Sequence, residues 1–322
     1  MKRRSFLKTA GSLAVVSAAP SLSQGEHPAT VKIAVPHRPY KDGVSISIVG
    51  LGGIALVGRT QAEANRLVAE AVDCRVNYVD IAPSYGKGEA EQKMGPALEP
   101  FRKDVFLACK TGERKAEGAQ RELEQSLKNL RTDHFDLYQL HGISKMEEVE
   151  TVTSPGGALE ALVKARESGL IRYIGFSAHL EDAALALCDR FAFDSVLFPV
   201  NFVCYSQGNF GPRLLAKAKE KGMRLLALKA LALRPWIAAD DRGSYPHCWY
   251  KPIDDPSLAR KALRFTLGEG VTALVPPGDV RMVRLAISLA GEIETPLTEG
   301  ERQPLFQAAR GIEPVFKTSS VL

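Results

Sequence analysis

The sequence has few cysteines and no long apolar run. Its 322 residues contain five cysteines, an odd number that is widely spaced and includes no Cys-x-x-Cys pair. This usage disfavours a disulfide framework, and several of the cysteines fall in apolar strand or helix patterns typical of buried free thiols. No window approaches the roughly 18 uninterrupted apolar residues of a transmembrane helix, so no stable membrane span is expected in the folded part.

A strong excess of charge is also missing once the N-terminus is set aside. The formal net charge is +5, but Lys2, Arg3, Arg4 and Lys8 lie in an N-terminal segment without acids, which leaves +1 for residues 26–322. A nucleic-acid partner is therefore not expected. With 45% hydrophobic and 25% charged residues, the composition is that of a globular protein with one large core or two small ones.

The first 25 residues have the layout of an export signal. A basic start precedes a mildly apolar run over residues 9–19 and then a turn-rich stretch. Residues 3–8, Arg-Arg-Ser-Phe-Leu-Lys, resemble a bacterial twin-arginine signal, which is an address read by a receptor. A general secretory signal is the alternative, and cleavage fits after Ala18 or after Ser23. The resemblance implies that the twin-arginine machinery exports the folded protein, so that residues 26–322 work in the periplasm or outside the cell.

Strand and helix patterns alternate along the rest of the chain. Short apolar runs predict strands, and segments with apolar residues at i, i+3, i+4 and i+7 predict helices. The expected strands are 47–51, 78–81, 104–110, 135–141, 171–177, 195–201, 223–229 and 271–275. The expected helices are 61–72, 89–98, 116–130, 157–167, 181–190, 212–221, 256–267 and 280–289, followed by a last helix that begins at Thr298. A long loop is expected over residues 230–255.

Eight strand–helix units define the predicted fold. Eight units in about 250 residues indicate a (β/α)8 TIM barrel of the α/β class in one domain. The turn dipeptide Asp42-Gly43 predicts a small β-hairpin ahead of the barrel. A doubly wound open sheet is the alternative, but it requires a G-x-G-x-x-G turn after the first strand, and residues 50–53 (Gly-Leu-Gly-Gly) lack that spacing.

Four polar residues follow three consecutive predicted strands. Asp80 lies near the end of one strand and Tyr85 in its loop, and the next two strands end in Lys110 and His141. The carboxyl ends of barrel strands meet on one face, where catalytic residues lie, so these side chains are expected to converge. Asp80 would be the counter-ion that makes burial of Lys110 tolerable.

This set of side chains has a chemical logic. A tyrosine with a pKa near 10 releases its proton reluctantly, and a neighbouring ammonium stabilises the phenolate. His141 can donate a hydrogen bond to a carbonyl oxygen that lies between it and Tyr85. Together they predict protonation of an oxygen as negative charge develops on it, as hydride reduction of an aldehyde or ketone requires.

Three segments carry a resemblance to a known family. Residues 77–86 (Asn-Tyr-Val-Asp-Ile-Ala-Pro-Ser-Tyr-Gly), the stretch from Ser126 to His141 and residues 171–177 (Ile-Arg-Tyr-Ile-Gly-Phe-Ser) resemble the aldo-keto reductase family in order and spacing. The resemblance spans roughly residues 40–310.

That resemblance implies an NAD(P)-dependent oxidoreductase that interconverts a small carbonyl compound and an alcohol. By the resemblance Tyr85 is the proton donor, Asp80 and Lys110 tune it, and His141 orients the carbonyl. The cofactor would be NADPH or NADH, extended across the mouth of the barrel.

The resemblance also implies cofactor contacts after the later strands. Ser177 and Asn201 would hold the carboxamide, and Lys229 would meet the pyrophosphate. Gly278 belongs to the usual phosphate site of a barrel, which loops seven and eight form with a helix N-terminus. Arg281 and Arg284 are further candidates for a phosphate contact.

Three positions depart from the family pattern. Ala178 stands where the family usually has Asn, and Leu228 stands where an aromatic residue often stacks on the nicotinamide. Asp279 replaces the basic residue that commonly binds the 2′-phosphate. The resemblance thus favours NADPH, whereas Asp279 argues against it.

Two other functions compete for the same residues. An exported cofactor-binding module with little turnover is the main alternative, and a barrel hydrolase would need paired carboxylates where only Asp80 is well placed. No second ligand cluster accompanies His247 and Cys248, so no metal is expected. Trp236, Trp249 and Tyr250 are predicted to pack the long loop over the barrel mouth.

Overall fold

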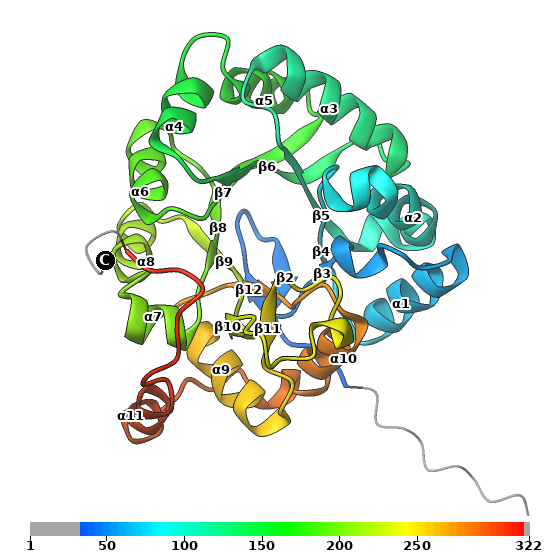
Figure 1. The fold of residues 1–322 in the computed structure, drawn as a ribbon. Helices are drawn as coiled ribbons and strands as arrows, with labels where there is room; N and C mark the ends of the chain where they lie inside the picture. The colour runs from blue at the N-terminus through cyan, green and yellow to red at the C-terminus, as the bar shows by residue number, and fades with distance from the viewer. Residues whose placement is uncertain (1–32, 319–322) are drawn as a thin grey trace, which may run out of the picture. The chain divides into compact units, whose positions relative to one another are not determined.

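Eight parallel strands form the centre of the molecule in a computed structural model that describes residues 33–318. The predicted export signal lies outside these residues. In the sheet the strands follow their order along the chain (Figure 1). They are β3 (Leu51–Gly52), β4 (Tyr78–Asp80), β5 (Phe106–Thr111), β6 (Phe135–Ile143), β7 (Ile171–Ala178), β8 (Ser195–Pro199), β9 (Arg224–Leu228) and β12 (Ala273–Val275).

Backbone hydrogen bonds beside the first and last strands close the sheet into a barrel. Val49 forms a parallel bridge with Leu274. The N–H of Gly50 donates to the carbonyl of Leu274 at 2.8 Å, and the N–H of Leu274 donates to the carbonyl of Ile48 at 2.9 Å. The predicted (β/α)8 TIM barrel is confirmed.

Helices form a ring outside the strands, as Figure 1 shows. Their starts follow local chemistry: Thr60 and Glu63 form a capping box, and the Asp255 side chain accepts from the N–H of Leu258. The ring consists of α1 (Gln61–Asp73), α2 (Glu89–Leu98), α3 (Ala116–Asn129), α5 (Ala158–Glu167), α6 (Glu181–Arg190), α8 (Pro212–Glu220), α9 (Pro256–Gly268) and α10 (Val280–Ser288). The predicted last helix is α11 (Glu299–Ala308), and Thr298 caps it as expected.

The predicted hairpin covers the end of the barrel where the strands begin. Strands β1 (His37–Pro39) and β2 (Ser45–Ser47) pair antiparallel. Asp42 and Gly43 turn between them with φ of 50° and 79°, a conformation that favours this dipeptide. The Tyr40 ring is fully buried and packs among aromatic rings at the strand starts.

Residues 230–255 were expected to form a loop, and this prediction was wrong in part. They contain two short antiparallel strands, β10 (Ala232–Pro235) and β11 (Tyr250–Pro252). Both strands are short and lie close to turn-forming residues, so the sequence shows no clear alternation of apolar and polar residues there.

Two helices were also missing from the prediction. They are α4 (Met146–Thr153) and α7 (Phe202–Gly208), both too short for a clear periodic pattern. Short 3-10 turns complete the described chain at η1 (Gly53–Leu56), η2 (Tyr85–Gly88), η3 (Glu99–Asp104), η4 (Arg242–Ser244) and η5 (Ala290–Glu292).

Four cysteines, Cys109, Cys188, Cys204 and Cys248, are buried free thiols, as predicted. A search of residues 33–318 found no helix with the length and apolar character needed to cross a membrane.

Gly50 offers a test of how the barrel closes. A Cβ added at Gly50 would lie 2.5 Å from Cδ1 of Tyr78, a fully buried ring. We expect Gly50→Ala to lower the free energy of unfolding by about 1–3 kcal/mol, as overpacking does. The control is Gly300→Ala in α11, where the nearest heavy atom would be 4.0 Å away. Urea unfolding measures both variants, and a Gly50→Ala protein as stable as wild type would contradict this packing.

Candidate active site

A cavity of about 210 Å³ opens at the carboxyl ends of the barrel strands. Its lining brings together seven of the ten side chains or glycines predicted from the sequence, contributed by loops and strand ends far apart along the chain. These residues are Asp80, Tyr85, Lys110, His141, Ser177, Lys229 and Gly278.

Asp80 and Lys110 form a buried ion pair at the bottom of this cavity. Their side chains are 3% and 1% exposed, and the Lys110 Nζ donates to Oδ1 of Asp80 and, at 3.0 Å, to the carbonyl of Ile81. Burial opposes charge on Lys110, but the Asp80 carboxylate acts against burial, and the pKa of Lys110 is raised above 10.5. Lys110 therefore stays an ammonium at neutral pH, as predicted from the strand ends.

Two buried side chains that the sequence patterns did not single out hold the other oxygen of Asp80. The Tyr78 hydroxyl donates to Oδ2 at 3.2 Å, and Gln139 Nε2 donates to the same atom at 3.3 Å. Burial and the Asp80 charge raise the pKa of Tyr78 well above 10, so its hydroxyl remains a donor. Residues i and i+2 of a strand lie on the same face, so the sequence alone places Tyr78 beside Asp80 on β4.

Tyr85 lies at the start of η2, beside the ion pair. The Lys110 Nζ is 5.3 Å from the centre of the Tyr85 ring. The Lys110 charge works to lower the pKa of Tyr85, as expected, but burial is the larger effect and the pKa is raised above 10. The phenol is therefore a neutral acid at physiological pH rather than a phenolate.

His141 faces Tyr85 across the cavity. The two ring centres are 5.9 Å apart and the rings meet edge to face. Burial, followed by the charge of Lys110, lowers the pKa of His141 to about 3. The imidazole is therefore neutral at pH 7 and can donate one N–H without adding charge to the site.

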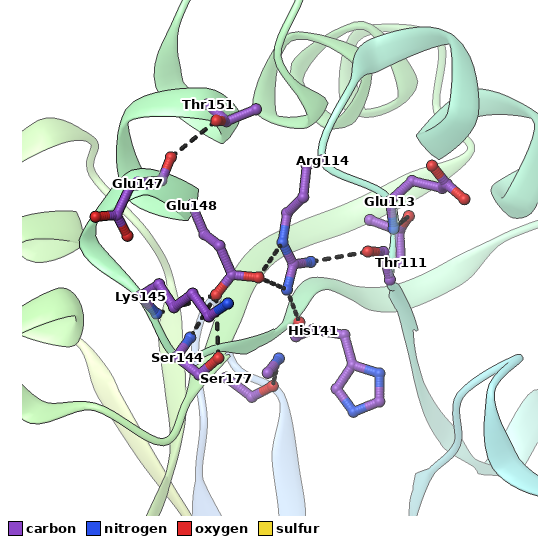
Figure 2. Close-up of polar contacts among 12 residues, drawn as sticks. Thr111, Glu113, Arg114, His141, Ser144, Lys145, Glu147, Glu148, Thr151 and Ser177 are labelled. Atoms are coloured by element: carbon purple, nitrogen blue, oxygen red, sulfur yellow. Dashed lines mark hydrogen bonds and ion pairs between the residues drawn. The ribbon is translucent and has the colours of Figure 1, made fainter.

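Side chains from a loop, a helix and a strand nearby fix the backbone that carries His141. Arg114 donates to the carbonyl of His141 at 2.9 Å and to Oε1 of Glu148 at 2.9 and 3.0 Å. Ser177 Oγ accepts the N–H of Gly142 at 2.7 Å. Figure 2 shows Arg114 between Glu148 and the His141 carbonyl. Glu148 also accepts the N–H groups of Ser144 and Lys145, the two residues just before α4, at 2.7 and 3.0 Å, and so it fixes the start of this helix.

Lys229 follows β9 and lies at the mouth of the cavity. Its ammonium is 5.2 Å from the ring centres of both Trp249 and Tyr250. Burial, with the like charge of Lys110 as a smaller cause, lowers the pKa of Lys229 to about 8. Its backbone has φ of 66°, a region that costs a residue with a Cβ about 1–3 kcal/mol.

The other three predicted cofactor contacts do not line the cavity. The Asn201 side chain caps α7 by accepting the N–H of Cys204 at 2.8 Å. Arg281 is bound to Asp279 through Nε at 2.9 Å and Nη2 at 3.0 Å, and Arg284 holds Glu70 at 2.8 Å. Their role in cofactor binding stays a prediction.

The segment from β10 to β11 roofs the cavity, as the sequence predicted for its aromatic residues. Trp249 and Tyr250 line the cavity, and Trp236 Nε1 donates to the carbonyl of Cys248 at 2.8 Å. Trp249 also meets the ring of Phe316, which stacks on His179. His179 and His247, which sequence reasoning did not propose, line the same space. Within residues 33–318 no three His, Cys, Asp or Glu side chains are grouped to hold a metal ion.

Comparison with known proteins gives a family match over most of the barrel. The model of the aldo/keto reductase family matches residues 48–246. The chain is 33% identical over 147 residues to the uncharacterized oxidoreductase YqkF of Bacillus subtilis, which covers 42% of this chain and 46% of that protein. The chain thus spans about half the length of this relative. It is also 24% identical over 305 residues to L-galactose dehydrogenase of Arabidopsis thaliana, covering 85% of this chain and 92% of the plant enzyme.

A solved structure shares the fold. The holo form of the aldo-keto reductase AKR11C1 from Bacillus halodurans matches with a TM-score of 0.68 at 23% sequence identity. The match covers 89% of this chain and 100% of the other. At this level of identity the likeness establishes the architecture alone.

The buried ion pair generates a double-mutant prediction. Removing one partner leaves the other charge buried and unpaired, so Asp80→Asn and Lys110→Met should each lower the free energy of unfolding by about 3–5 kcal/mol. The double variant should lose much less than the sum, because no lone charge remains. Urea unfolding gives all four values, with the exposed pair Glu117–Arg121 as a control expected to contribute under about 1 kcal/mol. Additive losses at Asp80 and Lys110 would contradict the pairing.

Proposed function

Because this chain belongs to the aldo/keto reductase family, we propose that it interconverts an aldehyde or ketone and an alcohol, with Tyr85 as the proton donor. One observation carries the proposal: a protonated phenol lies beside a buried ammonium and faces a neutral imidazole in one cavity. A nicotinamide dinucleotide would supply the hydride that such a reduction needs.

The protein's own residues account for the proton. The raised pKa of Tyr85 keeps the phenol protonated until negative charge develops on the substrate oxygen. The Lys110 ammonium, which Asp80 holds in place, then stabilises the phenolate that remains. His141 donates a hydrogen bond to the same oxygen and orients the carbonyl.

The cavity wall has residues that can hold a nicotinamide, which NAD and NADP share. The two arginines proposed for the 2′-phosphate, which only NADP has, are already paired. Ser177 and Gly278 are available on the cavity wall. Arg281 and Arg284, however, already hold the carboxylates of Asp279 and Glu70. A 2′-phosphate would meet the negative charge of Asp279, so we favour NAD(H) over NADP(H).

Substitution of the phenol tests the chemistry. Tyr85→Phe should lower kcat for aldehyde reduction about 10²–10⁴-fold, the usual contribution of a general acid. The rate is measured as the decrease in absorbance of the reduced cofactor with each aldehyde of a panel. Tyr205→Phe, in α7 and packed on Phe265, is the matched control and should keep the wild-type rate. Equal rates for Tyr85→Phe and wild type would remove Tyr85 from the reaction.

The proposal extends to where the protein works. The twin-arginine resemblance of residues 3–8 supports export of the folded chain, and a cofactor bound before export would supply the enzyme in a compartment without free reduced nicotinamide.

Export and cofactor identity have one joint test. Protein isolated from the periplasm of a producing bacterium should carry bound NAD in a native mass spectrum, whereas an Arg3→Lys/Arg4→Lys variant should remain in the cytoplasm. Bound NADP would contradict the NAD(H) assignment. The same distribution of the wild-type protein and the Arg3→Lys/Arg4→Lys variant between cytoplasm and periplasm would contradict twin-arginine export. Protein that binds neither dinucleotide would contradict cofactor binding.

A further inference from the structure

The cavity contains a cation that has no carboxylate partner. Lys110 is matched by Asp80, and Lys251 in β11 holds Asp240 at 2.8 Å. Lys229, in contrast, makes no ion pair within 4.0 Å anywhere in residues 33–318. Among the described residues, its ammonium lies 5.2 Å from the ring centres of Trp249 and Tyr250.

Aromatic faces attract a cation but do not neutralise it. The Lys229 side chain lines the cavity together with His141 and His179, and burial with nearby positive charge lowers the pKa of these histidines to about 3 and about 4. Both are therefore neutral. Because Asp80 balances the charge of Lys110, the positive charge of Lys229 is left without a balancing negative charge in this cavity.

The backbone also indicates a specific role for the Lys229 side chain. Its φ of 66° is one that glycine adopts without strain and that residues with a Cβ rarely adopt. The N–H of Ala232 donates to the carbonyl of Lys229 at 2.8 Å and keeps this tight turn. The fold thus holds a long cationic side chain over the cavity at a position where its backbone is unfavourable.

We propose that the cavity takes carbonyl substrates that carry a carboxylate, and that Lys229 binds this carboxylate while the carbonyl lies between Tyr85 and His141. Charge-assisted hydrogen bonds from a partly desolvated ammonium are strong and short, and a carboxylate would complete the charge balance of the site. The inference rests on the proposed function, since it names the substrate class of the same site.

The family resemblance implies another anion for Lys229, the pyrophosphate of the dinucleotide. The positions of its neighbours favour the substrate. Lys229 lines the same cavity as Tyr85 and His141, between which the carbonyl would lie. A carboxylate on the same substrate molecule would therefore lie within the space that Lys229 lines.

Two aldehydes of similar shape separate the possibilities. We expect the ratio of kcat/KM for 4-carboxybenzaldehyde to that for 4-methylbenzaldehyde to fall about ten- to a hundredfold in Lys229→Met, as loss of a hydrogen bond to a charged group does. Lys229→Arg should retain most of the ratio. Lys251→Met is the same substitution at a lysine of β11 that does not line the cavity, and it should leave the ratio unchanged.

A binding measurement makes the test independent of turnover. Calorimetry should show 4-carboxybenzyl alcohol binding to the wild-type protein and about ten- to a hundredfold weaker binding to Lys229→Met. An unchanged ratio and unchanged binding in Lys229→Met would overturn the inference even in an active enzyme. Lys229→Met that loses dinucleotide affinity and treats both aldehydes alike would also overturn it, by assigning Lys229 to the cofactor. Failure of the proposed function appears differently, as carboxylate binding at Lys229 without reduction of either aldehyde.

Discussion

The buried ion pair between Asp80 and Lys110 is the interaction on which the site depends. A lysine that is 1% exposed would shed its proton without a carboxylate in contact, and Asp80 provides that contact from the adjacent strand. Tyr78 and Gln139 in turn donate to Asp80, so the carboxylate has a fixed position. The barrel supplies this geometry because neighbouring parallel strands end at the same face.

The fixed ammonium of Lys110 influences the protonation of the groups around it. Its charge contributes to keeping His141 neutral, while burial keeps Tyr85 protonated against the pull of the same charge. The cavity therefore presents two neutral hydrogen-bond donors to a substrate oxygen. At its mouth, Lys229 adds a second cation under the roof of Trp249 and Tyr250, which gives the cavity an electrostatic direction.

The sequence was sufficient for the barrel and for the convergence of Asp80, Tyr85, Lys110 and His141 on one cavity, because both follow from the positions of the strand ends. Strands with continuous apolar residues are easy to recognise, and Asp80, Lys110 and His141 stand at or near the ends of three of them. The antiparallel strands β10 and β11 escaped prediction because each has only three or four residues.

Pairings between distant segments were beyond the sequence patterns. Arg284 on α10 meets Glu70 on α1, and Asn201 turns to the N–H of Cys204, so neither extends into the cavity. Arg114, which holds the His141 carbonyl, pairs with Glu148 of α4, 34 residues away, and no local periodicity predicts this pair. Such contacts depend on which loops the closed barrel brings together.

Transfer of a labelled hydride is the most direct test of the central claim, that this cavity reduces a carbonyl. The wild-type protein would be given an unlabelled aldehyde and reduced nicotinamide dinucleotide that carries deuterium at both C4 positions. The account predicts an alcohol with one deuterium on its carbinol carbon and a hydroxyl proton that comes from solvent. An alcohol without deuterium on that carbon, or no alcohol with any carbonyl compound tried, would contradict it.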